Sequence, residues 1–269
     1  MDRSVVVAAE CRTPLKTITP TEHKNGTKSS NVKPYIRYTG ERLKIRSATS
    51  NVCKMISGLR SEQMRAINSI GFGSILNFNV DIIPTGLGFW LLRNYDPETC
   101  TLNVGSHTIS ITRELVHNIF GVPMGELEIE ETQRPRTADA VVGEWNAQFE
   151  NGEGVRMSPC NLQKRIERMT SCGRHFILNF LIFINTFLGE TTQNNTINRF
   201  FLPSIKRGVD IASFDWCTYM ITTLNRCTTL WRDTKKPFHG SVALLAVRYY
   251  IVSINLITIR ILFFDAIKN

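Results

Sequence analysis

The chain has 269 residues, of which 42% are apolar and 20% charged, a composition typical of one sizeable soluble domain. Seven cysteines without a C-x-x-C pair argue against a zinc module and against a disulfide framework. The apolar run at residues 4–9 is too short for a signal peptide, so a reducing intracellular compartment is expected.

The formal net charge of +9 is concentrated near the N-terminus. Residues 1–60 hold 12 Lys/Arg against 4 Asp/Glu, whereas residues 61–269 hold 20 against 19. Residues 1–57 also lack a sustained hydrophobic period, which predicts a disordered basic leader. The scattered charges favour a solvated leader, and binding to DNA phosphates is the open alternative.

A folded domain is predicted from residue 58 onward. Ser61 can cap a helix that runs to Ile70 and closes at residues 71–73. The next predicted helix, residues 88–95, ends at Asp96-Pro97 because proline disfavours helical geometry in the residue before it.

A β-hairpin is predicted next, from residues 100–104 and 107–111 on either side of Gly105-Ser106. A two-residue connection with glycine first suits a type II′ turn. The pairs that face each other are then Val104 and His107, Leu102 and Ile109, and Cys100 and Ile111. This register makes one face of the hairpin apolar and the other polar.

Thr112 can cap the helix that follows, with Glu114 in its first turn. Gly121 suits the C′ position of this helix, and Pro123 prevents continuation. A hairpin of two strands is only marginally stable in isolation, so both flanking helices are expected to pack on its apolar face. Residues 84–131 are therefore predicted to be a core element.

The order of these signals resembles the plant mobile domain family. The shared run is a helix with Trp90, then Asn-Tyr-Asp-Pro, a short hairpin, Ile-Thr, Glu-Leu-Val-His and Gly-Val-Pro-Met-Gly, clearest over residues 70–131. Weaker resemblance continues at residues 176–188, 200–204 and 214–231. The family-motif and core positions are Trp90, Tyr95, Asp96, Pro97, Leu102, Ile109, Ile111, Val116, Gly121, Pro123 and Gly125.

This resemblance implies a function but not a defined active site. Members of the family occur in transposable elements and in host proteins derived from them, and are often catalogued as aminotransferase-like. Some elements join a related region to a SUMO-protease-like cysteine peptidase. Host members act in the nucleus, in transposon silencing, genome stability and meristem maintenance. The resemblance thus implies nuclear localisation and a protein partner, with a nuclear phosphatase as the candidate.

The second half of the chain is predicted to be mainly helical. Helices are expected over residues 138–149, after the cap pair Ser158-Pro159, over residues 176–188 and from Ser213. The helix at 176–188 is apolar almost all round and too short for a bilayer, so it should be buried, with the Ser213 helix packed on it.

Two charged segments in this half are interpreted as solvated surface. The acidic residues Glu126, Glu128, Glu130 and Glu131 have no His or Asp nearby, which favours a linker over a metal or acid–base site. The helix after Ser158 carries Lys164, Arg165 and Arg168, but Glu167 interrupts the basic face and no aromatic accompanies it, which disfavours nucleic-acid binding.

The C-terminal residues 242–264 are long and apolar enough for a membrane span. Arg248 and Arg260 inside this run are costly in lipid, so no membrane is predicted. Residues 251–269 do not resemble a continuation of the family domain, which predicts a truncated domain at 58–250 followed by an atypical apolar tail.

No catalytic site is predicted. A pyridoxal phosphate enzyme needs a Schiff-base lysine, a pyridinium partner and a phosphate cradle, and none is identifiable. Cys100 and His107 are the candidate catalytic pair of a cysteine peptidase, but the hairpin register places the thiol on the apolar face, where it is expected to be an inert core residue. His117 is predicted to be a surface residue.

The sequence therefore predicts a mainly α single domain with one small β-hairpin, no cofactor and no metal. Its predicted function is that of a non-catalytic interaction module of transposon origin. The alternative is a nucleic-acid-binding accessory protein of a transposon that uses the basic leader.

Overall fold

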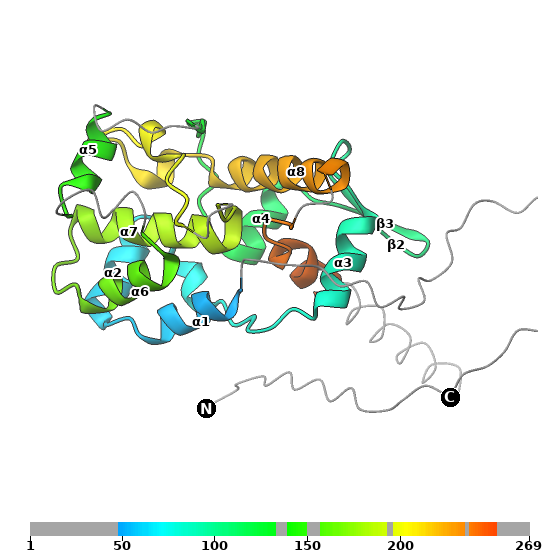
Figure 1. The fold of residues 1–269 in the computed structure, drawn as a ribbon, viewed down its shortest axis with the longest axis horizontal. Coiled ribbons are helices and arrows are strands. Elements are labelled where there is room, and N and C mark those ends of the chain that lie inside the picture. Colours follow the sequence, from blue (N-terminus) through cyan, green and yellow to red (C-terminus); the bar gives the residue numbers. More distant parts are fainter. Residues whose placement is uncertain (1–47, 133–138, 150–156, 193–195, 235–236, 252–269) are drawn as a thin grey trace, which may run out of the picture. The chain divides into compact units, whose positions relative to one another are not determined.

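A computed structural model of the chain describes residues 48–132, 139–149, 157–192, 196–234 and 237–251. The chain divides into two units, Met1–Lys33 and Pro34–Asn269, and all the described residues belong to the second. Their fold is mainly α-helical with one small antiparallel sheet, which confirms the predicted fold class (Figure 1).

The first helices extend the domain further toward the N-terminus than predicted. Helix α1 (Ser50–Ser57) buries Val52 and Met55 completely, so the prediction of a disordered leader was wrong for residues 50–57. Helix α2 (Ser61–Ser69) lies where the sequence predicted it, but the predicted cap was wrong, because Ser61 is the first helical residue and Arg60 is the N-cap residue. The backbone N–H of Arg60 donates to the Gln63 side chain at 2.9 Å. A 3₁₀ turn, η1 (Gly73–Asn77), then leads to helix α3 (Thr85–Asn94).

The sheet has three strands, β1 (Tyr95–Asp96), β2 (Thr101–Val104) and β3 (His107–Ser110), in sequence order. The pairs Leu102–Ile109 and Val104–His107 confirm the predicted hairpin register. Gly105 has the positive φ of +59° that the turn demands. Strand β1 was not predicted, because two residues are too few to show the alternating hydrophobic pattern of a strand.

Helix α4 (Arg113–Phe120) has the predicted caps. Its N-cap Thr112 accepts from the backbone N–H of Leu115 at 3.3 Å, and Gly121 is left-handed at its C-terminus with φ of +62°. Leu102 and Ile109 of the hairpin and Val116 of α4 all lie in the hydrophobic core.

Helix α5 (Ala140–Asn146) and helix α6 (Pro159–Arg168) lie where the sequence predicted them, with Ser158 capping α6. Helix α7 (Arg174–Ile184) is buried almost throughout, as expected, and continues into a π-helical segment, η3 (Asn185–Gly189). No sequence pattern predicted this π-helical turn. In it the backbone N–H of Glu190 donates to the Asn185 carbonyl at 2.9 Å.

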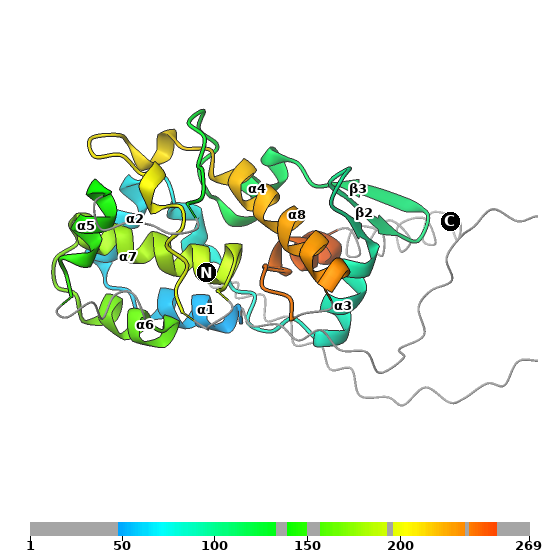
Figure 2. The ribbon, with the colours of Figure 1, turned by 45° about the horizontal axis from the view of Figure 1, so that its top comes forward.

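Helix α8 (Trp216–Thr234) starts three residues later than predicted, because Ser213 belongs to a short 3₁₀ turn, η5 (Ile211–Ser213). A second such turn, η4 (Leu202–Ser204), precedes it. Helix α8 packs chiefly on α4 (Figures 1 and 2). It also packs on η3, which is the C-terminal part of the helix predicted at residues 176–188, so the predicted packing on the Phe176 helix is confirmed there. Trp216 reaches that helix indirectly, through Phe72, whose ring meets the rings of Trp216 and Phe180 edge-on.

The described chain ends in a last helical stretch, residues 243–251. Among the described residues no helix is both long and apolar enough to cross a membrane. The predictions for residues 1–47 and for the tail beyond residue 251 fall outside the part of the chain that the structure describes.

Candidate functional site

The motif residues that the sequence singled out lie in the core and at the turns between α3 and the end of α4. Those that are buried are Tyr95, Leu102, Ile109, Ile111, Val116, Gly121 and Pro123. The hydroxyl of Tyr95 donates to Asn225 Oδ1 on α8, and burial raises its pKa. Trp90 is half-buried and meets the ring of Tyr249 at a centroid distance of 5.4 Å.

Asp96 and Pro97 form the turn between β1 and β2. The Asp96 carboxylate accepts from Thr99 Oγ1 at 2.8 Å and from Glu98 N at 3.0 Å. The hydrogen bond from Thr99 is the main reason that the pKa of Asp96 lies below its ordinary value. The carboxylate therefore stabilises a turn.

Gly121 and Gly125 are needed because other chain segments approach them closely. A Cβ on Gly121 would lie 2.0 Å from Ser74 Cβ, and one on Gly125 would lie 2.1 Å from the carbonyl oxygen of Ser213. At both positions the glycine lets a loop from a distant part of the sequence pack against the backbone.

The structure separates Cys100 from His107. Cys100 lies at the open end of the hairpin, where its backbone carbonyl accepts from Ile111 N, whereas His107 pairs with Val104 beside the turn. The Cys100 thiol contacts Asn225 Nδ2 at 3.2 Å. His117 is exposed, as expected, and its Nδ1 lies 2.8 Å from the carbonyl oxygen of Val122.

The acidic residues after α4 do not form a solvated linker. Residues 123–132, called here the acidic strip, run extended against residues 200–216. Gly125 N–H donates to the Phe214 carbonyl at 3.1 Å and Leu127 N–H to the Ser213 carbonyl at 2.9 Å. Further along, the backbone of Glu130 both donates to and accepts from the Ser204 hydroxyl, at 2.9 and 2.8 Å. The linker interpretation was wrong because main-chain hydrogen bonds fix the strip.

Several side chains of the acidic strip are exposed. Glu126, Glu128 and Glu130 are exposed, and none of them forms an ion pair with a described residue. Met124 and Leu127, at 38% and 43% exposure, are among the most exposed large apolar side chains of the described chain. The strip thus presents unpaired carboxylates beside exposed apolar groups.

The acidic strip ends in an ion-paired cluster around Arg226 of α8. Arg226 donates to Glu131 Oε2 through Nη1 and to Glu190 Oε2 through Nη2, and Tyr219 donates to Glu131 Oε1 at 2.7 Å. The cluster joins three segments that are far apart in the sequence. The sequence analysis did not predict this cluster, because it grouped Glu131 with the exposed acidic residues and considered only the apolar positions of the helix that contains Arg226.

The electrostatics of the Arg226 cluster follow from its burial. Desolvation raises the pKa of Glu190, and the nearby Glu131 adds to this effect while Arg226 opposes it. Burial also raises the pKa of the thiols of Cys227 and Cys217, to about 12 for Cys217. Both thiols are therefore protonated near neutral pH and are poor nucleophiles.

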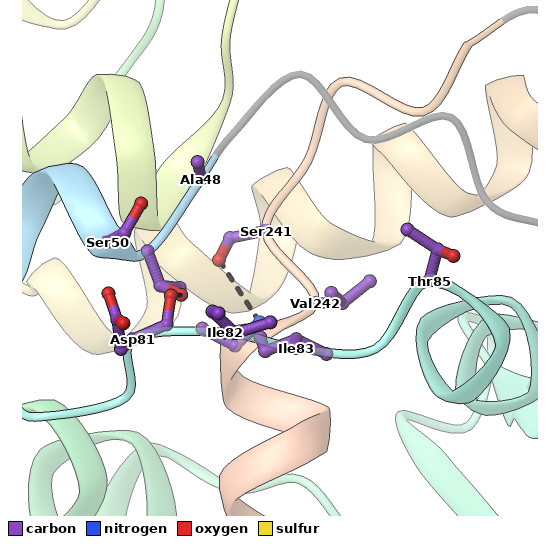
Figure 3. A pocket seen from close by; sticks show the side chains of 10 residues that line it. Ala48, Ser50, Asp81, Ile82, Ile83, Thr85, Ser241 and Val242 are labelled. Atoms are coloured by element: carbon purple, nitrogen blue, oxygen red, sulfur yellow. Dashed lines mark hydrogen bonds between the residues drawn. The ribbon is translucent and has the colours of Figure 1, made fainter.

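Small cavities lie at the surface of the described chain. One, of about 90 Å³, lies beside Glu190, Cys227 and His239. Another, of about 210 Å³, lies between the start of α1, residues 81–85 and residues 241–243 (Figure 3). Hydroxyl groups of Ser50, Thr85 and Ser241 line the larger cavity together with Ile82, which is 75% exposed. Among the described residues no three His, Cys, Asp or Glu side chains gather in a way that could hold a metal ion.

These features define the class of the protein: a helical domain whose long helix α8 anchors a small sheet and an extended acidic strip. Residues 45–246 match the model of a family described as "Domain of unknown function (DUF8566)", and the chain belongs to this family. The match begins before α1, in agreement with the folded residues there. Searches among curated proteins and among solved structures found no match. The resemblance to the plant mobile domain stays a prediction.

Proposed function

We propose that the protein is a non-catalytic interaction module that recognises a basic protein partner through the acidic strip. The observation that carries this proposal is the arrangement of Glu126, Glu128 and Glu130, which are exposed and form no ion pair with a described residue, beside the exposed Met124 and Leu127. Unpaired charges of one sign attract a partner of the opposite sign and steer its approach. Exposed apolar side chains add area that a partner can bury.

The way the strip is held supports the same proposal. Its backbone is hydrogen-bonded to residues 200–216, so the conformation of the recognition surface is fixed before a partner arrives. Pre-organisation lowers the entropy cost of binding. The nearby Arg226 cluster is occupied by its own ion pairs, which suits an anchor for the strip better than a reaction centre.

The resemblance to the plant mobile domain supplies the biological setting of this proposal. It places the module in the nucleus, as a product of a transposable element, with transposon silencing, genome stability or meristem maintenance as its process. A nuclear phosphatase is then the first partner to test. The second proposed function, a DNA-binding accessory role for the leader, is favoured by the 12 Lys/Arg against 4 Asp/Glu in residues 1–60.

The test is a quantitative comparison of partners that co-purify with three forms of the full chain. The strip variant Met124→Ser/Leu127→Ser should lose the specific partner, because the apolar contact is removed. The matched control Leu230→Ser changes a side chain that is 52% exposed on α8, outside the strip, and should retain it. A purified partner should then bind the wild type directly and the strip variant at least roughly tenfold more weakly. Equal binding by all three forms would reject the strip as the recognition surface.

A further inference from the structure

A group of arginines surrounds helix α5 from three other segments. Arg174 at the start of α7 and Arg207 both donate to Glu144 Oε2, at 3.0 and 3.1 Å. Arg199 donates to Asn146 Oδ1 at 3.1 Å, and Arg165 of α6 donates to the Gln148 carbonyl at 2.9 Å. The four arginines thus contact α5 and the turn after it between residues 144 and 148.

Aromatic residues of α5 and of the turn after it hold two of these arginines in place. The guanidinium carbon of Arg165 lies 4.5 Å from the ring centroid of Phe149, and that of Arg199 lies 5.1 Å from the Trp145 ring. The sequence had suggested that no aromatic accompanies the basic face of α6. The structure corrects this, because Phe149 comes from another segment.

Basic residues at the end of α6 extend the group. Arg168, three residues after Arg165 and on the same side of the helix, is exposed, and so is Lys164. Arg60 donates to the Met169 carbonyl just beyond α6. The name arginine band is used below for Arg165, Arg168, Arg174, Arg199 and Arg207.

Two arginines of the band share a single carboxylate, because Arg174 and Arg207 both pair with Glu144. Glu144 and Asp139, the N-cap residue of α5, are the carboxylates on α5 itself, and Glu167 of α6 is hydrogen-bonded to Gln163. Arg165 and Arg199 rest on aromatic rings and amide or carbonyl oxygens, which do not cancel a positive charge. Burial lowers the pKa of Arg199, as expected of a guanidinium that has lost water without gaining a carboxylate.

We propose that the arginine band binds the sugar–phosphate backbone of duplex nucleic acid, independently of base sequence. A polyanion matches a row of like charges on one face, and arginine suits phosphate because its donors are paired and planar. The Phe149 ring is covered by Arg165 and the Trp145 ring by Arg199, and Trp145 is also fully buried. Neither ring therefore offers a surface on which an unpaired base could stack. This favours a duplex over a single strand. The site differs from the acidic strip and from the leader.

The test measures binding of a fluorescent duplex of about 20 base pairs to the full chain across a salt series of about 50 to 300 mM. The variant Arg168→Gln/Arg207→Gln removes two exposed charges, one of which, Arg207, has a side chain that is 63% exposed. Because every form keeps the leader, any difference between them belongs to the folded domain. The matched control is Arg93→Gln, an exposed arginine of α3 that also lies over a ring, that of Phe89, and both views place α3 at the opposite end from α5 (Figures 1 and 2).

The expected result is that the double variant binds roughly tenfold more weakly at 0.1 M salt, with a log–log salt slope shallower by about two, while the control is unchanged. An equal loss of duplex affinity in the control and the double variant would overturn the proposal. It would show that binding depends on the total charge of the protein and not on the position of the arginine band. Unchanged binding by both would overturn it as well and leave the leader as the DNA contact. Tighter binding of an acidic peptide than of the duplex would replace nucleic acid with a protein ligand. None of these outcomes bears on the acidic strip.

Discussion

The acidic strip and the arginine band are two charged surfaces of opposite sign that meet at the same loop. The strip bonds to this loop at Phe200 and Ser204, and the band includes its Arg199 and Arg207. The strip is held by its backbone, and its Glu126, Glu128 and Glu130 side chains form no ion pair with a described residue, whereas Arg165, Arg174, Arg199 and Arg207 of the band are held by side-chain contacts. Substituting strip side chains should therefore alter binding alone, but substituting inner band residues or their partners should alter stability as well.

The largest expected effect comes from breaking the backbone support of the strip. Gly125→Ala places a Cβ within 2.1 Å of the Ser213 carbonyl oxygen and 2.7 Å of Phe214 N, and neither backbone can yield without losing the strip's hydrogen bonds. We expect a loss of ~3 kcal/mol of unfolding free energy, measured by denaturant titration. The matched control Gly58→Ala meets only ordinary contacts at 3.6 Å or more and should change stability by less than ~1 kcal/mol. Equal effects of the two substitutions would refute the steric argument.

The next largest effect should come from Arg226→Met at the end of the strip. It leaves Glu131 and Glu190 close together without their cation, and we expect a loss of ~2 kcal/mol near pH 7, below the full cost of a buried pair because Arg226 is 36% exposed.

This loss should depend on pH in a defined direction. Burial and Glu131 already raise the pKa of Glu190 in the folded state, so stability from this group increases as pH falls through that pKa. Without Arg226 the pKa rises further, and the variant should recover part of its loss on acidification from about pH 7 to about pH 5. A loss independent of pH in this window would contradict a role for the carboxylates.

Glu144→Gln tests the side-chain support of the band. Burial opposes ionisation of Glu144, but Arg174 and Arg207 outweigh it and lower the pKa. The carboxylate therefore stabilises the fold above its unfolded pKa of about 4.3 and loses this effect as pH falls through the folded pKa. We expect ~1 kcal/mol lower stability at neutral pH, vanishing in acid.

The same substitution sharpens the comparison between the two surfaces. Because Glu144→Gln removes a negative charge from the band, it should strengthen duplex binding while it weakens the fold. The control Glu62→Gln breaks an exposed pair with Arg65, at 3.2 Å, and should change stability by no more than ~0.5 kcal/mol. A weaker fold with weaker duplex binding would count against the band.

The smallest effect on stability is expected for the strip itself. Glu126→Gln, Glu128→Gln and Glu130→Gln together remove three charges that form no ion pair with a described residue, and the strip backbone stays hydrogen-bonded. The free energy of unfolding should therefore change by less than ~0.5 kcal/mol. Affinity for a basic partner should fall nonetheless. A large loss of stability would show that these carboxylates support the fold.

The sequence by itself determined the local elements of this protein. The type II′ connection at Gly105, the cap Thr112 and the left-handed Gly121 were predictable because turn and cap preferences depend on neighbouring residues alone. The apolar run of α7 predicted its burial for a similar reason. These signals also fixed the fold class.

Only the tertiary structure decided where the charged residues act. In the sequence, Glu131 cannot be distinguished from the exposed acidic residues beside it, and Arg226 is one cation in an amphipathic helix. Their ion pair joins residues that are 95 positions apart and forms only in the folded chain. Phe149 reaches Arg165 from the turn after α5, and β1 becomes a strand only because β2 lies beside it. The physical reason is the same in each case: an ion pair, a cation–π contact or a β-ladder depends on which distant segment lies alongside, and local preferences do not contain that information.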